Sequence, residues 1–398
     1  MENLNFVIKK FQEYYKSNKL ILPPRFSSRE YGFMSFDKEG MIRHIKFSSE
    51  SEIKNFLIQN VPAHAYYSAA YYRFPEQKKM EDKEWLGADL IFDLDADHMV
   101  KKDLNYEDML NIVKKEVKKI IENFLIPDFG ISEKNINLIF SGGRGYHIHV
   151  REESIYTLGS DERREIVNYI TGSNANIFSY IKRNNDGIFI VPGENEYGWY
   201  GKISREIIKL SQNIYFMYKQ GNFKEIDELM KNAGVKNRKK LFNVLFSEKR
   251  IYEKNREFKK MVIEILMESG NGKKLNYIGD EDLIIQFLDI LKYHLVENVI
   301  GKTDEPVTTD IHRLIRLPGS LHGKTSLIVT PVSINEIDDF NPLRDAVCSK
   351  IFSNIIKINI LKNVSINFLN EHYNLKEGEE EIPESLALFL ILRNLAKL

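Results

Sequence analysis

Three aspartates at alternate positions close an otherwise apolar segment, Leu90 to Asp97, which reads LIFDLDAD. In a β-strand alternate side chains share a face, so Asp93 and Asp95 point the same way. Burying unpaired carboxylates costs free energy, and a bound divalent cation is the usual compensation. The pair therefore indicates a magnesium-type site where a strand ends. Alone the pattern is weak, because most such pairs are solvated strand ends.

A second segment, SGGRGYHIHV, combines glycines with an arginine and two histidines. Glycines after a strand let the backbone turn and aim its N–H groups at an anion, and Arg144 adds a planar fork for phosphate oxygens. His147 and His149 then share one face of the next strand. The segment predicts a phosphate-binding loop, and a plain glycine hairpin with two surface histidines is the alternative.

A third segment, DEPVTTDIHRLIRLPGSLHGKT, begins with acids and ends in a basic turn. Asp304 is a candidate third carboxylate. Arg316, His322 and Lys324 surround a Pro–Gly turn, as a polyphosphate requires. By itself this is an ordinary basic loop. Together the three segments supply the parts of a two-metal phosphoryl-transfer site.

Hydrophobic periodicity predicts the elements that position these segments. It indicates helices at 5–15, 52–59 and 103–125, the last ended by Pro127, and strands at REYGFMSF, MIRHIKF, 88–95, 137–140 and YHIHV. The acids then lie at the end of one strand, and the glycine loop joins two others.

The composition changes after this part, and a charged stretch follows from 192 to 298. Its amphipathic segments predict helices near 203–219, 223–233, 236–246, 254–269 and 280–297. Strand-like and turn-like segments return afterwards, and a last helix is expected at 383–397. The sequence thus predicts an α/β (α+β) fold, in which 1–191 and 299–398 form one discontinuous catalytic core around an inserted helical domain, 192–298. The plainest interpretation of that insertion is a surface scaffold.

The bulk composition of the 398 residues narrows the class of protein. Lys+Arg and Asp+Glu both number 57, so net charge does not point to nucleic acid, membrane or acidic ligands. Local lysine and arginine clusters at 114–119 and 236–240 are more often solvated helix faces than binding sites. A single cysteine, Cys348, excludes a disulfide framework and a cysteine-based zinc site. With no signal-peptide core and no apolar run long enough for a bilayer, we expect a soluble, cytoplasmic protein without membrane contact.

The motifs FDLDAD, SGGRGYHIHV and DEPVTTDIHRLIRLPGSLHGKT, in this order, resemble the catalytic small subunit of archaeal and eukaryotic DNA primase, the archaeal form more closely. REYGFMSF, MIRHIKF, HAYYSAAYY, IPDFG and PESLALFLILRNLAKL extend the resemblance over most of the chain outside the helical block. It implies a primase-polymerase core in which an RRM-like mixed sheet carries the acids, with a second, smaller α/β layer. It also implies synthesis of short RNA or DNA primers on single-stranded DNA from NTPs or dNTPs.

The resemblance assigns roles to individual residues. Asp93, Asp95 and Asp304 match the catalytic aspartates that bind two divalent cations, Mg²⁺ or Mn²⁺. Asp310, an acid in the same motif as Asp304, is the weaker candidate for the third role. The nucleotide-binding residues that it implies are Ser141, Arg144 and His147 in the loop, Arg316, His322 and Lys324 as their basic partners, and Arg43 on an early strand. Asp97 lies beyond the matched pair and is expected to be structural or outer-shell.

One departure from the family concerns zinc. The family usually carries a cysteine-rich zinc module shortly after the paired aspartates, whereas this chain has HMVKKDLNYEDML there. We therefore expect no structural zinc, since a site based on His98 has too few neighbouring ligands. The resemblance further implies a heterodimer with a large subunit that carries an iron–sulfur cluster, which a chain with one cysteine cannot hold.

Other functions stay open from the sequence. A metal-dependent glycosyltransferase is the alternative enzyme, because an aspartate pair at a strand end also binds nucleotide-sugar diphosphates. A non-catalytic nucleic-acid-binding module of the same fold is disfavoured by the presence of all three acids. A related end-joining polymerase would share the site and differ in needing a primer.

Overall fold

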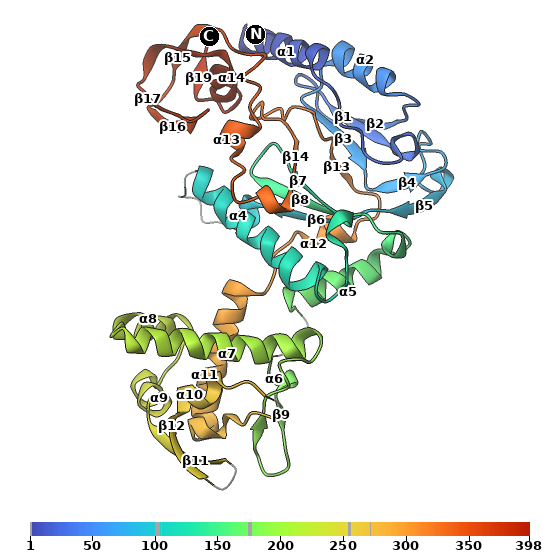
Figure 1. Cartoon of the computed structure of the whole chain (residues 1–398). Coiled ribbons are helices and arrows are strands. Elements are labelled where there is room, and N and C mark those ends of the chain that lie inside the picture. The colour runs from blue at the N-terminus through green and yellow to red at the C-terminus, as the bar shows by residue number, and fades with distance from the viewer. Residues whose placement is uncertain (1, 100–103, 105, 174–176, 254–255, 271) are drawn as a thin grey trace. The chain divides into compact units, whose positions relative to one another are not determined.

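The computed structural model describes residues 2–99, 104, 106–173, 177–253, 256–270 and 272–398 (Figure 1). The chain forms two compact units. The first comprises Met1–Lys118, Ile131–Val167 and Lys302–Leu398, and the second comprises Lys119–Gly130 and Asn168–Gly301. The second unit contains the whole stretch 192–298 together with residues on both sides of it. Within the described residues, no helix combines the length and the apolar character that a membrane crossing requires.

A four-stranded sheet in the first unit carries the acidic and glycine-rich segments. Its strands, in the order β14-β7-β8-β6, are Thr330–Val332, Ile136–Phe140, Gly145–Val150 and Leu90–Asp95. Phe92, Leu94 and Ile148 are fully buried and anchor the sheet in the core. Because the turn between β7 and β8 is short, these two strands must run antiparallel. The α/β class is thus confirmed, with antiparallel sheets where we expected a mixed one.

A second four-stranded antiparallel sheet in the first unit positions the basic turn. Its order is β13-β3-β1-β2, with β1 at Tyr31–Met34, β2 at Met41–Ile45, β3 at His64–Ser68 and β13 at Leu314–Arg316. The sequence predicted β1 and β2, and helices α1 (Glu2–Ser17) and α2 (Glu50–Asn60) accompany them as expected. The pairing of β13 with β3 carries the third segment next to residues far earlier in the chain.

The rest of the first unit consists of short hairpins and helices (Figure 1). They are α3 (Ala96–Met99), β4 (Ala70–Tyr72) with β5 (Trp85–Ala88), α12 (Glu305–Thr309), α13 (Pro342–Asp345), β15 (Ile355–Ile360) with β18 (Gly378–Pro383) and β19 (Ala396–Lys397), β16 (Val364–Phe368) with β17 (Glu371–Leu375), and α14 (Glu384–Leu392). The last helix was expected to reach residue 397, which is wrong. Asn394 adopts a left-handed conformation (φ 56°), which ends the helix and lets β19 pair with β15.

Helix α4 (Tyr106–Ile120) matches the expected helix at 103–125, except that Ile121–Leu125 form a π-helical turn and Asp103 lies outside the described residues. Helix α5 (Ser160–Thr171) follows β8. The second unit is built on α6 (Ile177–Tyr180), α7 (Gly198–Lys219), α8 (Phe223–Asn232), α9 (Arg238–Leu245), α10 (Val262–Met267) and α11 (Glu281–Asn298).

The second unit also contains hairpins that the sequence did not predict: β9 (Lys182–Arg183) with β10 (Phe189–Ile190), and β11 (Glu248–Glu253) with β12 (Arg256–Met261). The expected helix at 254–269 is therefore wrong in its first half. Arg250 is directly opposite Lys259, and a diagonal ion pair across the hairpin with Glu257 at 3.5 Å balances its charge and helps to stabilise the paired strands.

Candidate active site

The paired aspartates lie at the end of β6, against β8. Asp93 is opposite His147 and Asp95 is opposite Gly145. A Cβ atom at Gly145 would lie 2.3 Å from the carbonyl oxygen of Leu94, closer than any real contact. Only glycine therefore lets β8 approach β6 at this position, so this residue fixes where the aspartates lie.

Asp304 joins the pair from the far end of the sequence. Its backbone N–H donates to the carbonyl oxygen of Asp93 at 3.0 Å, and the Thr303 hydroxyl donates to the same oxygen at 3.2 Å. Helix α12 begins directly after Asp304 and packs against β6. Asp310, the weaker candidate, instead accepts a hydrogen bond from the backbone of His312 at 2.9 Å, which fixes the turn after α12.

The charges of this cluster act on Asp93. Burial, followed by repulsion from Asp95 and Asp304, raises the pKa of Asp93 to about 7, while Arg313 and Arg316 oppose the rise. Within the described residues, no three His, Cys, Asp or Glu side chains have the geometry of a metal site. The donor chemistry nevertheless fits a divalent cation, because it consists of carboxylate oxygens whose repulsion such an ion relieves.

His147 lies beside this cluster rather than in the glycine loop. Its Nε2 atom is 3.6 Å from Asp93 Oδ1. Burial and the nearby Arg316 and Arg313 lower the pKa of His147 to about 3, so the ring is neutral. Its Nδ1 atom is buried without a hydrogen-bond partner among the described residues. Arg313 thus acts on both Asp93 and His147, a role that the sequence did not assign to it.

The glycine loop packs against the basic turn. A Cβ atom at Gly142 would lie 2.8 Å from His322 Cβ, and one at Gly143 would lie 3.3 Å from His322 Nε2. The Thr325 hydroxyl donates to the carbonyl oxygen of Gly142 at 2.6 Å. The Ser141 hydroxyl accepts from the N–H of Gly143 at 3.3 Å and so holds the loop. Two predicted parts of the phosphate site are therefore in contact.

Arg144 leaves this loop toward solvent and forms an ion pair with Asp97. Both side chains are about half exposed, and exposed pairs are weak. Asp97, expected to be structural or outer-shell, therefore holds the guanidinium of Arg144. Little free energy is therefore lost when a phosphate oxygen replaces the carboxylate of Asp97 on Arg144.

The basic turn is organised by a histidine that the sequence did not predict. Arg316 Nη1 donates to His64 Nδ1 at 2.8 Å, and the backbone N–H of Gly323 donates to the same atom at 3.3 Å. Burial, followed by the charges of Arg316 and Lys324, lowers the pKa of His64 to about 3. The neutral ring of His64 therefore serves as an acceptor. In the sequence, the only feature that marked His64 was its position at the start of the tyrosine-rich segment that forms β3.

His322 and Lys324 complete the turn. The His322 ring is buried and packs edge-on against His64, with 4.8 Å between ring centroids. Its Nδ1 atom accepts a hydrogen bond from the backbone N–H of Lys324 at 3.3 Å. The remaining ring proton of neutral His322 therefore resides on Nε2, beside Gly143. Lys324 itself is exposed.

Arg43 does not join the other predicted residues. It lies on β2, at the opposite edge of its sheet from β13. Its guanidinium donates to the buried carboxylate of Glu30 at 3.0 and 3.4 Å, and buried Lys83 lies 3.4 Å from the same carboxylate. Glu30, directly before β1, thus already gives Arg43 a partner.

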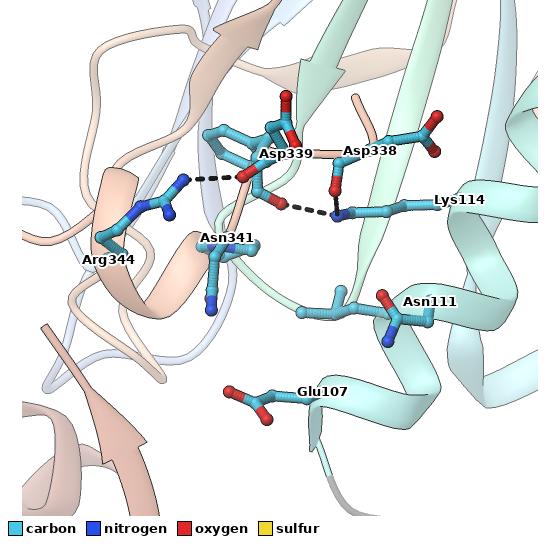
Figure 2. Close-up of a pocket in the computed structure, with 10 residues that line it drawn as sticks. Glu107, Asn111, Lys114, Asp338, Asp339, Asn341 and Arg344 are labelled. Carbon is cyan, nitrogen blue, oxygen red and sulfur yellow. Dashed lines mark hydrogen bonds between the residues drawn. The ribbon is translucent and has the colours of Figure 1, made fainter. Parts of the chain in front are cut away.

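Figure 2 shows a polar pocket of the first unit that none of the predicted site residues lines. Lys114 of α4 donates to the carbonyl oxygens of Asp338 at 3.2 Å and Phe340 at 2.6 Å, and Arg344 donates to that of Asp339 at 2.7 Å. Both cations in this pocket thus bind backbone oxygens. Lys114 attaches the segment before α13 to α4, whereas Arg344 ties that segment to α13 and also forms an ion pair with Asp345 at 2.7 Å. With these partners, both cations are poorly placed to receive a phosphate.

Comparison with known proteins agrees with the three motifs. The sequence profile of the family described as DNA primase small subunit matches residues 92–334. The chain is 40% identical to the DNA primase small subunit PriS of Picrophilus torridus, over 96% of this chain and 94% of the relative. It is 39% identical to that of Methanosarcina barkeri (98% and 96%) and 37% identical to that of Methanococcoides burtonii (98% and 96%). The chain belongs to the DNA primase small subunit family.

Proposed function

We propose that this chain is the catalytic subunit of a DNA primase, which synthesises short RNA or DNA primers on single-stranded DNA by nucleotidyl transfer. Asp93, Asp95 and Asp304 bind the cations in this scheme. One observation carries the assignment: Asp304, far away in sequence, is hydrogen-bonded to the backbone of Asp93 and raises its pKa. Family membership supports the same activity.

Two divalent cations, Mg²⁺ or Mn²⁺, would activate the primer 3′-hydroxyl and offset the charge on the α-phosphate and the leaving pyrophosphate. Residues of the chain itself supply the contacts to the triphosphate. Arg316 and Lys324 neutralise the triphosphate, and Arg144 exchanges Asp97 for a phosphate oxygen. His322 donates its Nε2 proton beside the N–H groups of the glycine loop, with Ser141 holding that loop. His147 stays neutral next to Asp93.

The proposed partners are a template strand, NTPs or dNTPs, and a larger subunit, as the name of the family implies. The iron–sulfur cluster belongs to that large subunit in this proposal, because Cys348 is the single cysteine here and is buried. A replication enzyme of this kind acts in the cytoplasm. The expectation that the chain lacks structural zinc stays a prediction, since the His98 side chain lies outside the described residues.

Asp95→Asn tests the proposal, with unprimed synthesis on single-stranded DNA as the assay and the large subunit present. We expect at least about a hundredfold loss of primer synthesis, as when a charge-stabilising group is removed from an active site. Full synthesis by this variant with Mg²⁺ or Mn²⁺ would falsify the assignment. Transfer from a UDP-sugar in place of nucleotide incorporation would favour the glycosyltransferase, and a strict need for a primer would favour the end-joining polymerase.

A further inference from the structure

Two adjoining hollows lie in the second unit, one among helices α7, α8 and α9 and the other around the start of α9. Figure 1 shows these three helices. The first, which we call the aromatic hollow, is lined by Tyr218, Phe223 and Phe242 over Met230 and has a volume of about 480 Å³. The second, the basic hollow, has the same volume and is lined by lysines, an arginine and two asparagines between 236 and 243. Arg238 and Lys239 line both hollows, so the two share a border.

The aromatic hollow presents rings that are already held in place. Tyr218 stacks on Phe246 with 3.8 Å between centroids, and Phe223 packs edge-on against Phe242 at 6.0 Å. Phe223 is nevertheless 52% exposed, while Met230 beneath is buried. A large apolar ring that is fixed by its neighbours and open to solvent suits a flat ligand, because little conformational entropy is lost on stacking.

The basic hollow carries an excess of positive charge. No acid lines it, although Arg238 pairs with Asp227 at 2.6 Å and Lys240 with Asp280 at 3.0 Å. Lys236 and Lys239 form no ion pair among the described residues and are exposed. The hollow therefore fits an anion whose charge two free ammonium groups balance.

We propose that the paired hollows bind single-stranded nucleic acid, with an unstacked base against Phe223 and the adjoining phosphates on Lys236 and Lys239. Alternating aromatic platforms and cations are the usual means of holding a single strand without reading its sequence. A duplex does not fit the aromatic hollow, because its bases are stacked on each other. The surface belongs to the second unit alone and needs none of the catalytic carboxylates.

The stacking half of the proposal is tested with Phe223→Ala in the full-length protein, by fluorescence anisotropy of a labelled oligothymidine. We expect binding to weaken about tenfold, within the range for one lost base–aromatic stack. Phe216→Ala is the matched control, because Phe216 is 59% exposed on α7 and lines neither hollow. Equal loss in the two variants, or none in either, overturns this half.

The phosphate half is tested with the double variant Lys236→Gln and Lys239→Gln. Because each phosphate contact on a single strand contributes about 0.7 to the slope of log K against log salt, we expect the slope to fall by about 1.4. The control is Lys224→Gln with Lys231→Gln, which removes two exposed lysines of α8 that line neither hollow and should leave the slope unchanged. Phe223→Ala should weaken binding without changing the slope.

The same variants separate this surface from the active site. Phe223→Ala should incorporate nucleotides normally when the template is saturating, whereas Asp95→Asn should lose incorporation and keep its affinity for oligothymidine. If the double lysine variant binds oligothymidine like the wild type but no longer binds the large subunit, the hollows are a protein-docking surface and the proposal is wrong.

Discussion

The active site and the paired hollows of the second unit both present cations, but they hold them differently. In the active site Arg316 is bound to a buried imidazole, and His322 is packed between His64 and the glycine loop. In the second unit Lys236 and Lys239 extend freely into solvent. The difference suggests that chemistry requires groups fixed to within a fraction of an ångström, whereas retention of a strand requires only nearby charge.

Gly145→Ala should have the largest effect, because it disturbs the rigid geometry of the active site. The added methyl group would collide with the backbone of Leu94, so we expect a loss of about 3 kcal/mol in unfolding free energy and loss of primer synthesis. Thermal denaturation and the synthesis assay measure both effects. Gly221→Ala is the control: its Cβ meets nothing within 4 Å, and only the cost of a positive φ, about 1 kcal/mol, should appear. Equal costs in both variants contradict the steric argument.

Asp304→Asn should abolish catalysis while leaving the fold intact. The backbone hydrogen bond to Asp93 remains in this variant, but one carboxylate charge is lost, so we expect at least about a hundredfold fall in kcat. Asp310→Asn serves as the matched variant and should keep most of the activity, since Asp310 fixes only a turn. The reverse result would transfer the third metal ligand to Asp310.

His64 tests whether fixed cations matter. His64→Phe keeps an aromatic ring but removes the acceptor for Arg316, so we expect the KM for the nucleotide to rise about tenfold or more, as for a lost bond to a charged group. His64→Asn retains an acceptor near the Nδ1 position and should recover part of this loss. A purely structural role would instead lower stability and leave KM unchanged in the active fraction.

His64 should also contribute to the pH dependence of folding stability. The pKa of His64 is lowered to about 3 in the folded state, so the unfolded chain binds its proton first as the pH falls below 6.5. Folding stability attributable to His64 is thus complete above pH 6.5 and declines toward pH 3, by about 2 kcal/mol at pH 5. Urea unfolding at pH 7 and pH 5 measures this decline. It should be smaller in His64→Asn, and an equal decline in both proteins would contradict the prediction.

The smallest effect is expected from Asp97→Asn. Since an exposed ion pair contributes less than about 1 kcal/mol, freeing Arg144 should lower the KM for the nucleotide by no more than about fivefold. Steady-state kinetics at two salt concentrations measure it, because screening should reduce the difference. A rise in KM would mean that Asp97 positions Arg144 rather than competing for it.

Local patterns explain what the sequence predicted. Alternation along LIFDLDAD placed Asp93 and Asp95 on one face, and the glycines of 142–145 marked the turn between two strands. Both features depend on residues within a few positions of each other. The neighbourhood of Asp304 was available only through resemblance to a family, since no local pattern indicates a hydrogen bond to Asp93.

The features that the sequence did not predict have a physical cause as well. His64 contacts Arg316 across 252 positions, a pairing that no periodicity encodes. Strand β12 was interpreted as the start of a helix at 254–269 because its charged residues fit either period, and pairing with β11 decided between them. Long-range contacts thus determined the parts of the site that the sequence could not predict.

The hydrogen bond between Asp304 and Asp93 sets an order of events during translation. Strands β6 and β8 leave the ribosome before Asp304 and the basic turn are synthesised, and the larger part of the second unit, Asn168–Gly301, lies between β8 and Asp304 in the chain. At the usual rates of synthesis this interval lasts about ten seconds or more. A nascent chain therefore carries an incomplete set of carboxylates for that time, and the catalytic centre closes only after the helical unit has had time to fold.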